Sequence, residues 1–127
     1  EGSEYEDLEE YHQSPYCDNN YWAGAKLTCQ EKNMTLPTRA QLAQLASELY
    51  VDNSGNDITF AEDTNRTGLQ LRDQYKQIYP ITFGHPYWSS EELNASYAHY
   101  RTFGTTTSSW YGSDKAGIYY RAICISN

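Results

Sequence analysis

The stretch PYWSSEE, residues 86–92, contains residue types that a hydrolytic site uses, because two adjacent serines are followed by two carboxylates. His85 lies directly before it, and His99 follows it. A serine nucleophile needs a histidine base and an acid that orients this base, and many such serines stand in a G-x-S-x-G turn. That turn is absent around Ser89 and Ser90. The composition is more typical of a β-strand, so we predict sheet scaffolding here and no nucleophile.

A second candidate site is the acidic turn DNSGND, residues 52–57, because carboxylates and amides are the ligands that a calcium loop uses. Counted from Asp52, Asp63 occupies the twelfth place, where an EF-hand loop carries a bidentate Glu. Gly55 falls at the fourth place instead of the sixth. We therefore predict an ordinary turn and a domain that needs no metal and no other cofactor.

The three cysteines, Cys17, Cys29 and Cys124, do not show the C-x-x-C spacing of a zinc site. One disulfide and one remaining thiol is the simplest arrangement of three cysteines. The residues alone leave the pairing open.

The net charge of −8 is distributed unevenly along the chain. Six of the 17 acidic residues and none of the nine Lys and Arg lie in residues 1–10, which leaves 11 acidic and nine basic residues for the remainder. We interpret residues 1–15 as an acidic, solvated tail or linker and residues 16–127 as one domain. Without a cluster of Lys and Arg, binding to nucleic acid is not expected. No stretch has the length and apolar composition for membrane insertion, and a chain that starts with Glu suggests a processed product.

Two segments carry the pattern of an amphipathic helix. Behind a candidate N-cap at Asn20, the spacing of Trp22 and Cys29 places both residues on one buried face. A second helix is predicted in LPTRAQLAQLASELY, where Thr38 and Gln41 form a capping-box pattern. Its apolar stripe consists of Leu42, Leu45, Ala46 and Leu49.

The second half of the chain is predicted to be rich in strands. Residues 51–86 hold many turn-forming residues and are expected to be a long loop with a short helix at LQLRDQYKQIY. YWSSEE, YAHYRTF and GIYYRAICIS have the aromatic and β-branched composition of antiparallel strands. In the first of them, Tyr87 and Trp88 should alternate across the strand. The last has apolar residues on both faces, as a central strand has.

The order of these segments resembles a known family. A helix bearing WAGAKLTC, a second helix opened by LPTRAQLAQL, a loop, YWSSEE and a closing strand YYRAICI are together similar to the bacterial C-type-lectin-like domains that end surface adhesins. Examples are the distal domains of invasin- and intimin-type proteins and the C-terminal domain of the Legionella collagen-like protein. The resemblance covers about residues 16–126.

The resemblance implies an α+β, C-type-lectin-like fold in which two helices pack on antiparallel strands and the first and last strands lie side by side. It also implies a disulfide between Cys29 and Cys124, and therefore an oxidising compartment. Cys17 has no counterpart and would be a free thiol or the partner of another segment. The E-P-N or Q-P-D and W-N-D triplets of calcium-dependent animal lectins are absent from the chain, so their mechanism of sugar binding is not expected.

The function that remains is surface recognition. Tyr and Trp supply large contact areas at low entropic cost, and Ser, Thr and Gly adapt to a ligand. TTTSSWYGSDKAG, residues 105–117, has this composition and is expected to be a loop that presents Trp110 and Tyr111. Asp114 and Lys115 would orient a polar ligand. The complete predicted ligand-binding set is Tyr97, Tyr100, Arg101, Trp110, Tyr111, Asp114 and Lys115.

We therefore predict a non-enzymatic recognition domain at the cell surface or outside the cell, as an adhesin tip or a pilus-associated subunit. Its partner would be a host or cell-surface protein or glycan. The alternative is an assembly module that packs on neighbouring subunits of a surface filament. A catalytic role is the least favoured reading, because no set of acid, base and nucleophile emerges.

Overall fold

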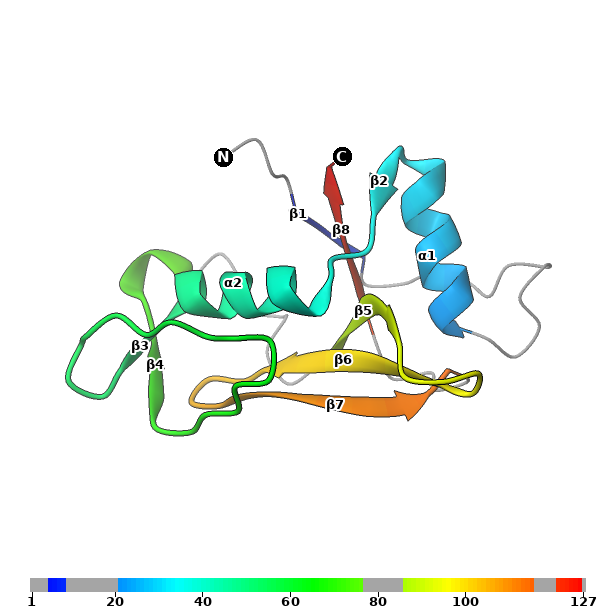
Figure 1. Ribbon diagram of the computed structural model, residues 1–127. Helices are drawn as coiled ribbons and strands as arrows, with labels where there is room; N and C mark the ends of the chain where they lie inside the picture. Colours follow the sequence, from blue (N-terminus) through cyan, green and yellow to red (C-terminus); the bar gives the residue numbers. More distant parts are fainter. Residues whose placement is uncertain (1–4, 9–20, 77–85, 116–120, 127) are drawn as a thin grey trace.

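The computed structural model describes residues 5–8, 21–76, 86–115 and 121–126 (Figure 1). Within these residues the chain forms two α-helices and three antiparallel sheets, which confirms the predicted α+β class. The helices are α1, Tyr21–Glu31, and α2, Arg39–Leu49.

The first sheet has the order β1-β8-β2, with strands Tyr5–Leu8, Ala122–Ser126 and Met34–Thr35. The second sheet pairs β3, Tyr50–Asp52, with β4, Leu69–Leu71. The third has the order β5-β6-β7, with strands Pro86–Glu92, Tyr97–Phe103 and Ser108–Asp114.

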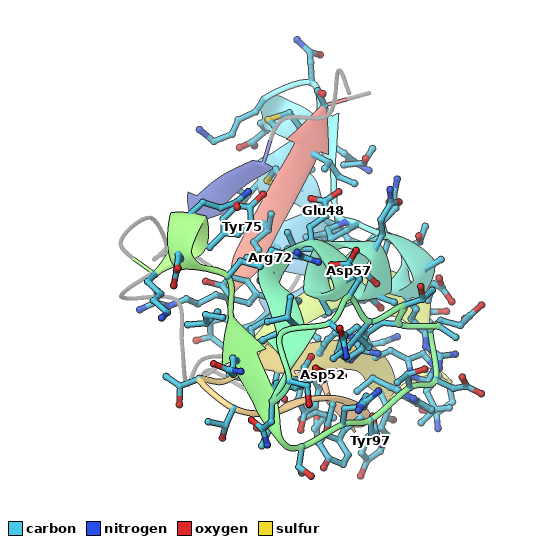
Figure 2. The ribbon with its side chains drawn as sticks, turned by 90° about the vertical axis from the view of Figure 1, so that its left-hand side faces the viewer. Glu48, Asp52, Asp57, Arg72, Tyr75 and Tyr97 are labelled. Carbon is cyan, nitrogen blue, oxygen red and sulfur yellow. A yellow bond between two sulfur atoms is a disulfide. The ribbon has the colours of Figure 1, made fainter. Side chains whose placement is uncertain are left out.

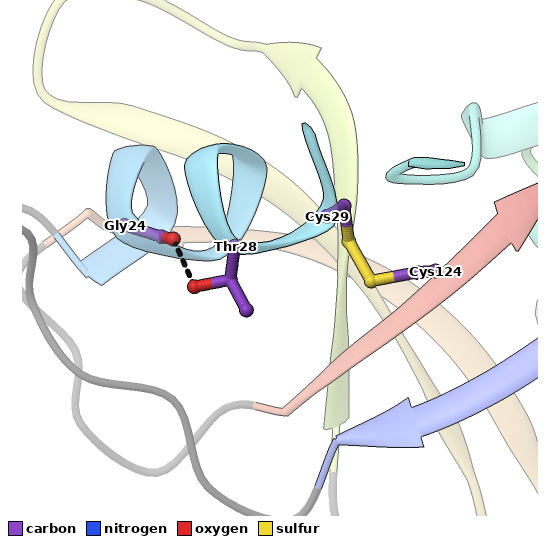
Figure 3. The surroundings of a disulfide bond; sticks show 4 residues. All are labelled: Gly24, Thr28, Cys29 and Cys124. Atoms are coloured by element: carbon purple, nitrogen blue, oxygen red, sulfur yellow. Dashed lines mark hydrogen bonds between the residues drawn. A yellow bond between two sulfur atoms is a disulfide. The ribbon is translucent and has the colours of Figure 1, made fainter. Parts of the chain in front are cut away.

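The helix α1 is tied to the first sheet by a disulfide. Trp22 and Cys29 are both buried, as their helical spacing predicts, whereas the proposed N-cap Asn20 lies outside the described residues. Cys29 is bonded to Cys124 of β8, the pair that the family resemblance implies (Figure 3). Cys17 lies outside the described residues. A cross-link between positions 95 residues apart stabilises a fold by roughly 4–5 kcal/mol on the chain-entropy model.

The helix α2 begins at a complete capping box. The Thr38 hydroxyl accepts a hydrogen bond from Gln41 N at 3.1 Å, and the Gln41 side-chain oxygen accepts one from Thr38 N at 2.8 Å. Both orphan N–H groups are therefore satisfied, and the helix starts where the sequence predicts. The predicted apolar stripe is buried and consists of Leu42, Leu45, Ala46 and Leu49.

The strand β5 lies between two apolar clusters. Tyr87 belongs to the cluster under α2, and Trp88 belongs to the cluster under α1, so the two side chains alternate across the strand as predicted. Ser89 is fully buried, and its hydroxyl accepts a hydrogen bond from Glu91 N at 3.1 Å. These contacts confirm that PYWSSEE is sheet scaffolding. His85 lies outside the described residues.

The strand β8 is the centre of the first sheet, which confirms the prediction for residues 122–126. Residues 122–125 are buried on both faces of the strand. β1 pairs with β8 along its whole length, so the first and last described strands lie side by side. Residues 5–8, which lie in the segment interpreted as an acidic tail or linker, thus form a strand of this sheet. Strand pairing is made by backbone groups, which every residue type carries. The acidic side chains of this segment therefore did not indicate that it pairs with β8.

The region between α2 and β5 contains more regular structure than the predicted long loop. β3 and β4 form a two-stranded sheet within it. The predicted helix at LQLRDQYKQIY is wrong for residues 69–76, which form β4 and a short 3-10 helix, Asp73–Tyr75. Leu69 is buried under α2 while Gln70 is exposed, and this alternation is the pattern of a strand.

Arg72 closes the C-terminal end of α2. Its guanidinium donates hydrogen bonds to the carbonyl oxygens of Glu48 and Ser47, at 3.0 and 3.3 Å. The same group pairs with the Asp57 carboxylate at 3.0 Å, and Figure 2 shows Arg72, Glu48 and Asp57 close together. The last carbonyls of a helix lack donors within the helix, so Arg72 supplies a cap that comes from beyond β4.

Candidate functional site

The predicted ligand-binding residues lie on two neighbouring strands, or directly after the second. Tyr97, Tyr100 and Arg101 belong to β6, and Trp110, Tyr111 and Asp114 belong to β7, which Lys115 follows. β7 pairs with β6 over its full length. The prediction that residues 105–117 form a loop is therefore wrong for residues 108–114. The turn between the strands spans residues 104–107 and is closed by a hydrogen bond from Gly104 N to Thr107 O at 2.8 Å.

Pairing with β6 turns Trp110 and Tyr111 to opposite faces of the sheet. Trp110 lies opposite Arg101, on the face whose Phe103 packs in the cluster under α2. Tyr111 lies opposite Tyr100, on the other face. Successive side chains of a strand point to opposite sides, so these two neighbours do not form the single surface that the sequence predicts.

The side of β6 and β7 that faces away from α2 carries two tyrosines, and Tyr100 packs there against the cluster under α1 while Tyr111 lies toward solvent. We define the Tyr111 face as the side chains of Tyr100, Thr102, Ser109, Tyr111 and Ser113. The ring centroids of Tyr100 and Tyr111 lie 5.8 Å apart. Tyr100 also meets the buried Trp88 ring edge to face at 6.5 Å, which supports the tyrosine pair from within. Tyr111 is 50% exposed, and α2 lies on the far side of the sheet (Figure 1).

Hydroxyl groups surround the tyrosine pair. The Thr102 hydroxyl accepts a hydrogen bond from Ser109 N at 3.1 Å, so the side chain is held in place between the two strands. Ser113 and Ser109 are half-buried beside Tyr111 on β7. An aromatic ring flanked by small hydroxyl residues offers apolar contact area together with hydrogen bonding, which is the chemistry of a recognition surface.

Trp110 instead packs against residues on the α2 side of the sheet. The Arg39 guanidinium lies 3.9 Å from the centroid of the Trp110 ring, and the His99 ring meets it nearly edge to face at 5.3 Å. The Trp110 backbone N–H donates to the Asn65 side chain at 2.8 Å. Three buried nitrogens of this group, Trp110 Nε1, His99 Nδ1 and Arg39 Nε, have no hydrogen-bond partner among the described residues. Trp110 is therefore a packing residue at the start of α2.

His99 lies in an environment that favours its neutral form. Its side chain is buried, and burial together with the nearby Arg39 charge holds its pKa below the ordinary value. Glu91 and Glu62 act in the opposite direction but do not cancel the effect. The ring next to Trp110 is therefore an uncharged packing partner near neutral pH.

Arg101 is buried and donates three hydrogen bonds within the fold. Its guanidinium donates to Ser108 Oγ at 3.1 Å and to the carbonyl oxygens of Thr64 and Glu62 at 3.0 and 3.3 Å. Burial and the Arg39 charge lower its pKa to about 10, which leaves it charged at neutral pH. Arg101 therefore fastens residues 62–64 to the sheet, and the expectation that it faces a ligand is corrected.

Lys115 has the same kind of role at the other end of the strands. It is 5% exposed, and its ammonium donates to the Glu92 carboxylate at 2.6 Å and to Ala95 O at 3.0 Å. The hydrogen bond and charge of Lys115 hold the pKa of the Glu92 carboxyl below its usual range. Lys115 thus locks the β5–β6 connection, and the expectation that it orients a ligand with Asp114 is corrected.

Tyr97 is exposed but stands apart from the Tyr111 face. It is 42% exposed and lies opposite Asp114 at the beginning of β6, and alternation along the strand places it on the same side as His99. Leu93, also exposed, folds over Gly112, where an added Cβ would meet its Cδ2 at 2.9 Å. Tyr97 and Tyr111 are therefore two similarly exposed tyrosines on opposite sides of one sheet.

The turn DNSGND uses its first carboxylate internally. Asp52 accepts hydrogen bonds from Ser54 N at 2.8 Å and Asn56 N at 2.9 Å, and these bonds hold its pKa below the usual range. Gly55 has a φ of 83°, a left-handed conformation that favours glycine. The segment is the turn that the sequence predicts. Among the described residues, no group of three or more His, Cys, Asp or Glu is placed to hold a metal ion.

Comparisons with protein-family models, curated proteins and solved structures found no match to this chain. Neither helix in the described part of the chain is long and apolar enough to cross a membrane. We therefore infer the function from the geometry of the site.

Proposed function

We propose that this domain is a non-enzymatic recognition module of a bacterial surface structure, at an adhesin tip or in a pilus-associated subunit. It binds a host or cell-surface protein or glycan through the Tyr111 face, without calcium. The observation that carries the proposal is the half-exposed Tyr111 ring, supported from within by Tyr100 and Trp88. An aromatic side chain that is held rigidly loses little entropy when it binds, which makes it an effective anchor.

The order of secondary structure supports a C-type-lectin-like fold for this module. β1 lies beside β8, and a disulfide links α1 to β8, as the family resemblance implies. A disulfide of this kind suits an exported protein, because oxidising compartments maintain such bonds. The assignment to an extracellular or cell-surface location rests on this bond and on the resemblance.

The serines of β5 support the non-enzymatic part of the proposal. Ser89 is fully buried, and its hydroxyl is occupied by Glu91 N. His99 lies on β6 with its ring against Trp110. A nucleophile must be accessible to substrate and close to its base, and Ser89 is not accessible.

The experiment that tests the proposal measures binding of the labelled chain to cultured host cells and to a glycan array. Tyr111→Ala should weaken binding about tenfold or more, because truncation of a central aromatic anchor commonly costs at least ~2 kcal/mol. Tyr97→Ala is the matched control, since it removes a similarly exposed tyrosine from the opposite side of the sheet. Equal loss in both variants, or no binding by the unmodified chain, would refute the proposal.

The alternative function is assembly into a surface filament, and the outer edge of β7 favours it. Among the described residues, Asn65 and Arg66 bond to this edge at Trp110 and Ser108, near its beginning. In an antiparallel pair, alternate residues direct their backbone groups outward, so Gly112 does so as well. An open strand edge is a template for a neighbouring strand. Binding of the chain to filaments of its own bacterium, without binding to host cells or glycans, would favour assembly.

A further inference from the structure

A pocket of about 370 Å³ lies where α1, α2, β2 and β5 meet. It shares no residue with the Tyr111 face. Lys26 and Gln30 of α1, Thr35 of β2, Thr38 and Gln41 at the start of α2, and Ser90 of β5 line it. Leu36, which is buried, supplies an apolar floor. Pockets that bind small molecules commonly have about 300–1,000 Å³ of space, so this pocket is large enough for a small ligand.

The walls of the pocket are held in place by contacts within the fold. Trp22 Nε1 donates to Ser89 O at 2.7 Å, which ties α1 to β5 directly beside Ser90. Ser90 N donates to Pro37 O at 2.8 Å, which ties β5 to the connection before α2. The capping box fixes the start of α2, and the Cys29–Cys124 disulfide anchors the helix turn that carries Gln30. The pocket is therefore preformed, and a ligand would not have to order it.

The polar groups of the pocket include several free donors. The capping box occupies the side-chain oxygen of Gln41 and leaves its NH₂ group to donate. It likewise uses the Thr38 oxygen as acceptor and leaves the hydroxyl proton. The hydroxyls of Thr35 and Ser90 and the amide of Gln30 make no side-chain hydrogen bond among the described residues. None of the described residues that line the pocket carries a carboxylate.

Lys26 gives the pocket a positive charge that is not neutralised by an ion pair. Its ammonium lies 4.5 Å from the centroid of the Trp22 ring, and no carboxylate of the described residues forms an ion pair with it. Glu92 lies near enough to feel the charge of Lys26, but its carboxylate is bonded to Lys115 at 2.6 Å. The pocket therefore combines one available cation with several neutral donors.

We propose that this pocket binds a small, hydroxyl-rich carboxylate, the chemical class of an acidic sugar. Lys26 pairs with the carboxylate, the amides of Gln30 and Gln41 donate to ring oxygens, and Leu36 packs against the apolar face of the ring. A carboxylate fits better than a phosphate, because the described part of the lining contains one ammonium and no arginine fork. The inference is independent of the proposed function, since the two sites have no residue in common.

The test is an NMR titration of the full chain with glucuronic acid and with N-acetylneuraminic acid at millimolar concentration, and with glucose as the neutral reference. At least one acidic sugar should shift the amide signals of Lys26, Gln30 and Ser90, and glucose should bind more weakly. Lys26→Gln keeps the aliphatic stem and should weaken binding of the acidic sugar about tenfold, because a hydrogen bond to a charged group is lost. Gln30→Ala, a milder change on the helix surface, should weaken binding by a smaller factor.

Lys76→Gln is the matched control, because it removes the same charge from an exposed lysine that pairs with Asp73 and does not line the pocket. It should leave the affinity unchanged, and melting curves should show all three variants folded. The inference is overturned if neither acidic sugar shifts the pocket residues, or if Lys26→Gln and Lys76→Gln have equal effects. Shifts confined to Tyr100 and Tyr111 would also overturn it while supporting the proposed function.

Discussion

The two faces of the β6–β7 hairpin use the same residue types for different purposes. On the face toward α2, Trp110 lies under the Arg39 guanidinium and Arg101 donates to the carbonyls of Thr64 and Glu62. On the Tyr111 face, the Tyr111 ring packs at a tilt against Tyr100 and keeps half of its surface exposed. Trp110 and Arg101, which face α2, stabilise the fold. Tyr111, on the opposite face, is available to a partner.

The difference shows that position in the pleat decides the role of each residue here. Trp110 and Tyr111 are adjacent and chemically similar, yet the Trp110 side chain points toward α2 and the Tyr111 side chain points to the opposite face. A shift of the β6–β7 register by one residue would exchange their environments.

The largest effect is expected from Arg101→Met. This substitution keeps the bulk of the side chain but leaves the Thr64 and Glu62 carbonyls and the Ser108 hydroxyl without their donor. We expect a loss of about 3 kcal/mol in the free energy of unfolding, measured by urea denaturation. Arg66→Met, at an exposed arginine two residues beyond Thr64, should change it by less than about 0.5 kcal/mol. Similar small effects of both variants would show that Arg101 does not hold the 62–64 segment.

Trp110→Ala should have the next largest effect on stability. It removes a half-buried ring that contacts Arg39 and His99, so we expect a loss of about 2 kcal/mol. Tyr111→Ala, at the neighbouring position on the open face, should cost less than about 1 kcal/mol, because it loses mainly the contact with Tyr100. Thermal and urea unfolding of the two variants side by side check the ranking, and a larger loss for Tyr111→Ala would reverse the assignment of the faces.

A smaller effect is expected on how the free energy of unfolding depends on pH, and it arises from His99 on the face toward α2. The pKa of His99 is lower in the folded protein than its ordinary value of 6.5, so below that pH the unfolded chain binds more protons than the folded one. The contribution of His99 to stability is therefore complete above about pH 6.5 and decreases as the pH falls toward its folded pKa. His99→Gln should flatten this part of the curve of unfolding free energy against pH. An unchanged slope between pH 7 and the folded pKa would contradict the buried, neutral His99.

Local patterns in the sequence predicted the parts of the fold that depend on near neighbours. The capping box of α2 joins Thr38 and Gln41, three residues apart, and the burial of Trp22 and Cys29 follows from helical spacing. Tyr87 and Trp88 alternate because β5 is a regular strand at that point. The disulfide pairing came from the family resemblance, because cysteine positions alone allow other pairs.

The parts that the sequence did not predict depend on contacts between distant segments. β7 was expected to be a loop because its serines and glycine are typical of turns, and pairing with β6 overrides that local preference. Nothing in the neighbourhood of Trp110 indicates Arg39, and nothing near Lys115 indicates Glu92. The alternation within SSWYGSD is the one local signal that separates Trp110 from Tyr111, because neighbouring residues of a strand point to opposite faces.

The central claim is that the Tyr111 face recognises the partner while the Trp110 side maintains the fold. The most direct test is the affinity of Tyr111→Ala for host cells or for a glycan identified on the array, measured beside Trp110→Phe, which keeps an aromatic ring at the helix side. The account predicts that Tyr111→Ala remains folded and binds about tenfold more weakly or worse, while Trp110→Phe binds as the unmodified chain does. Full binding by folded Tyr111→Ala, or loss of binding by folded Trp110→Phe, would contradict it.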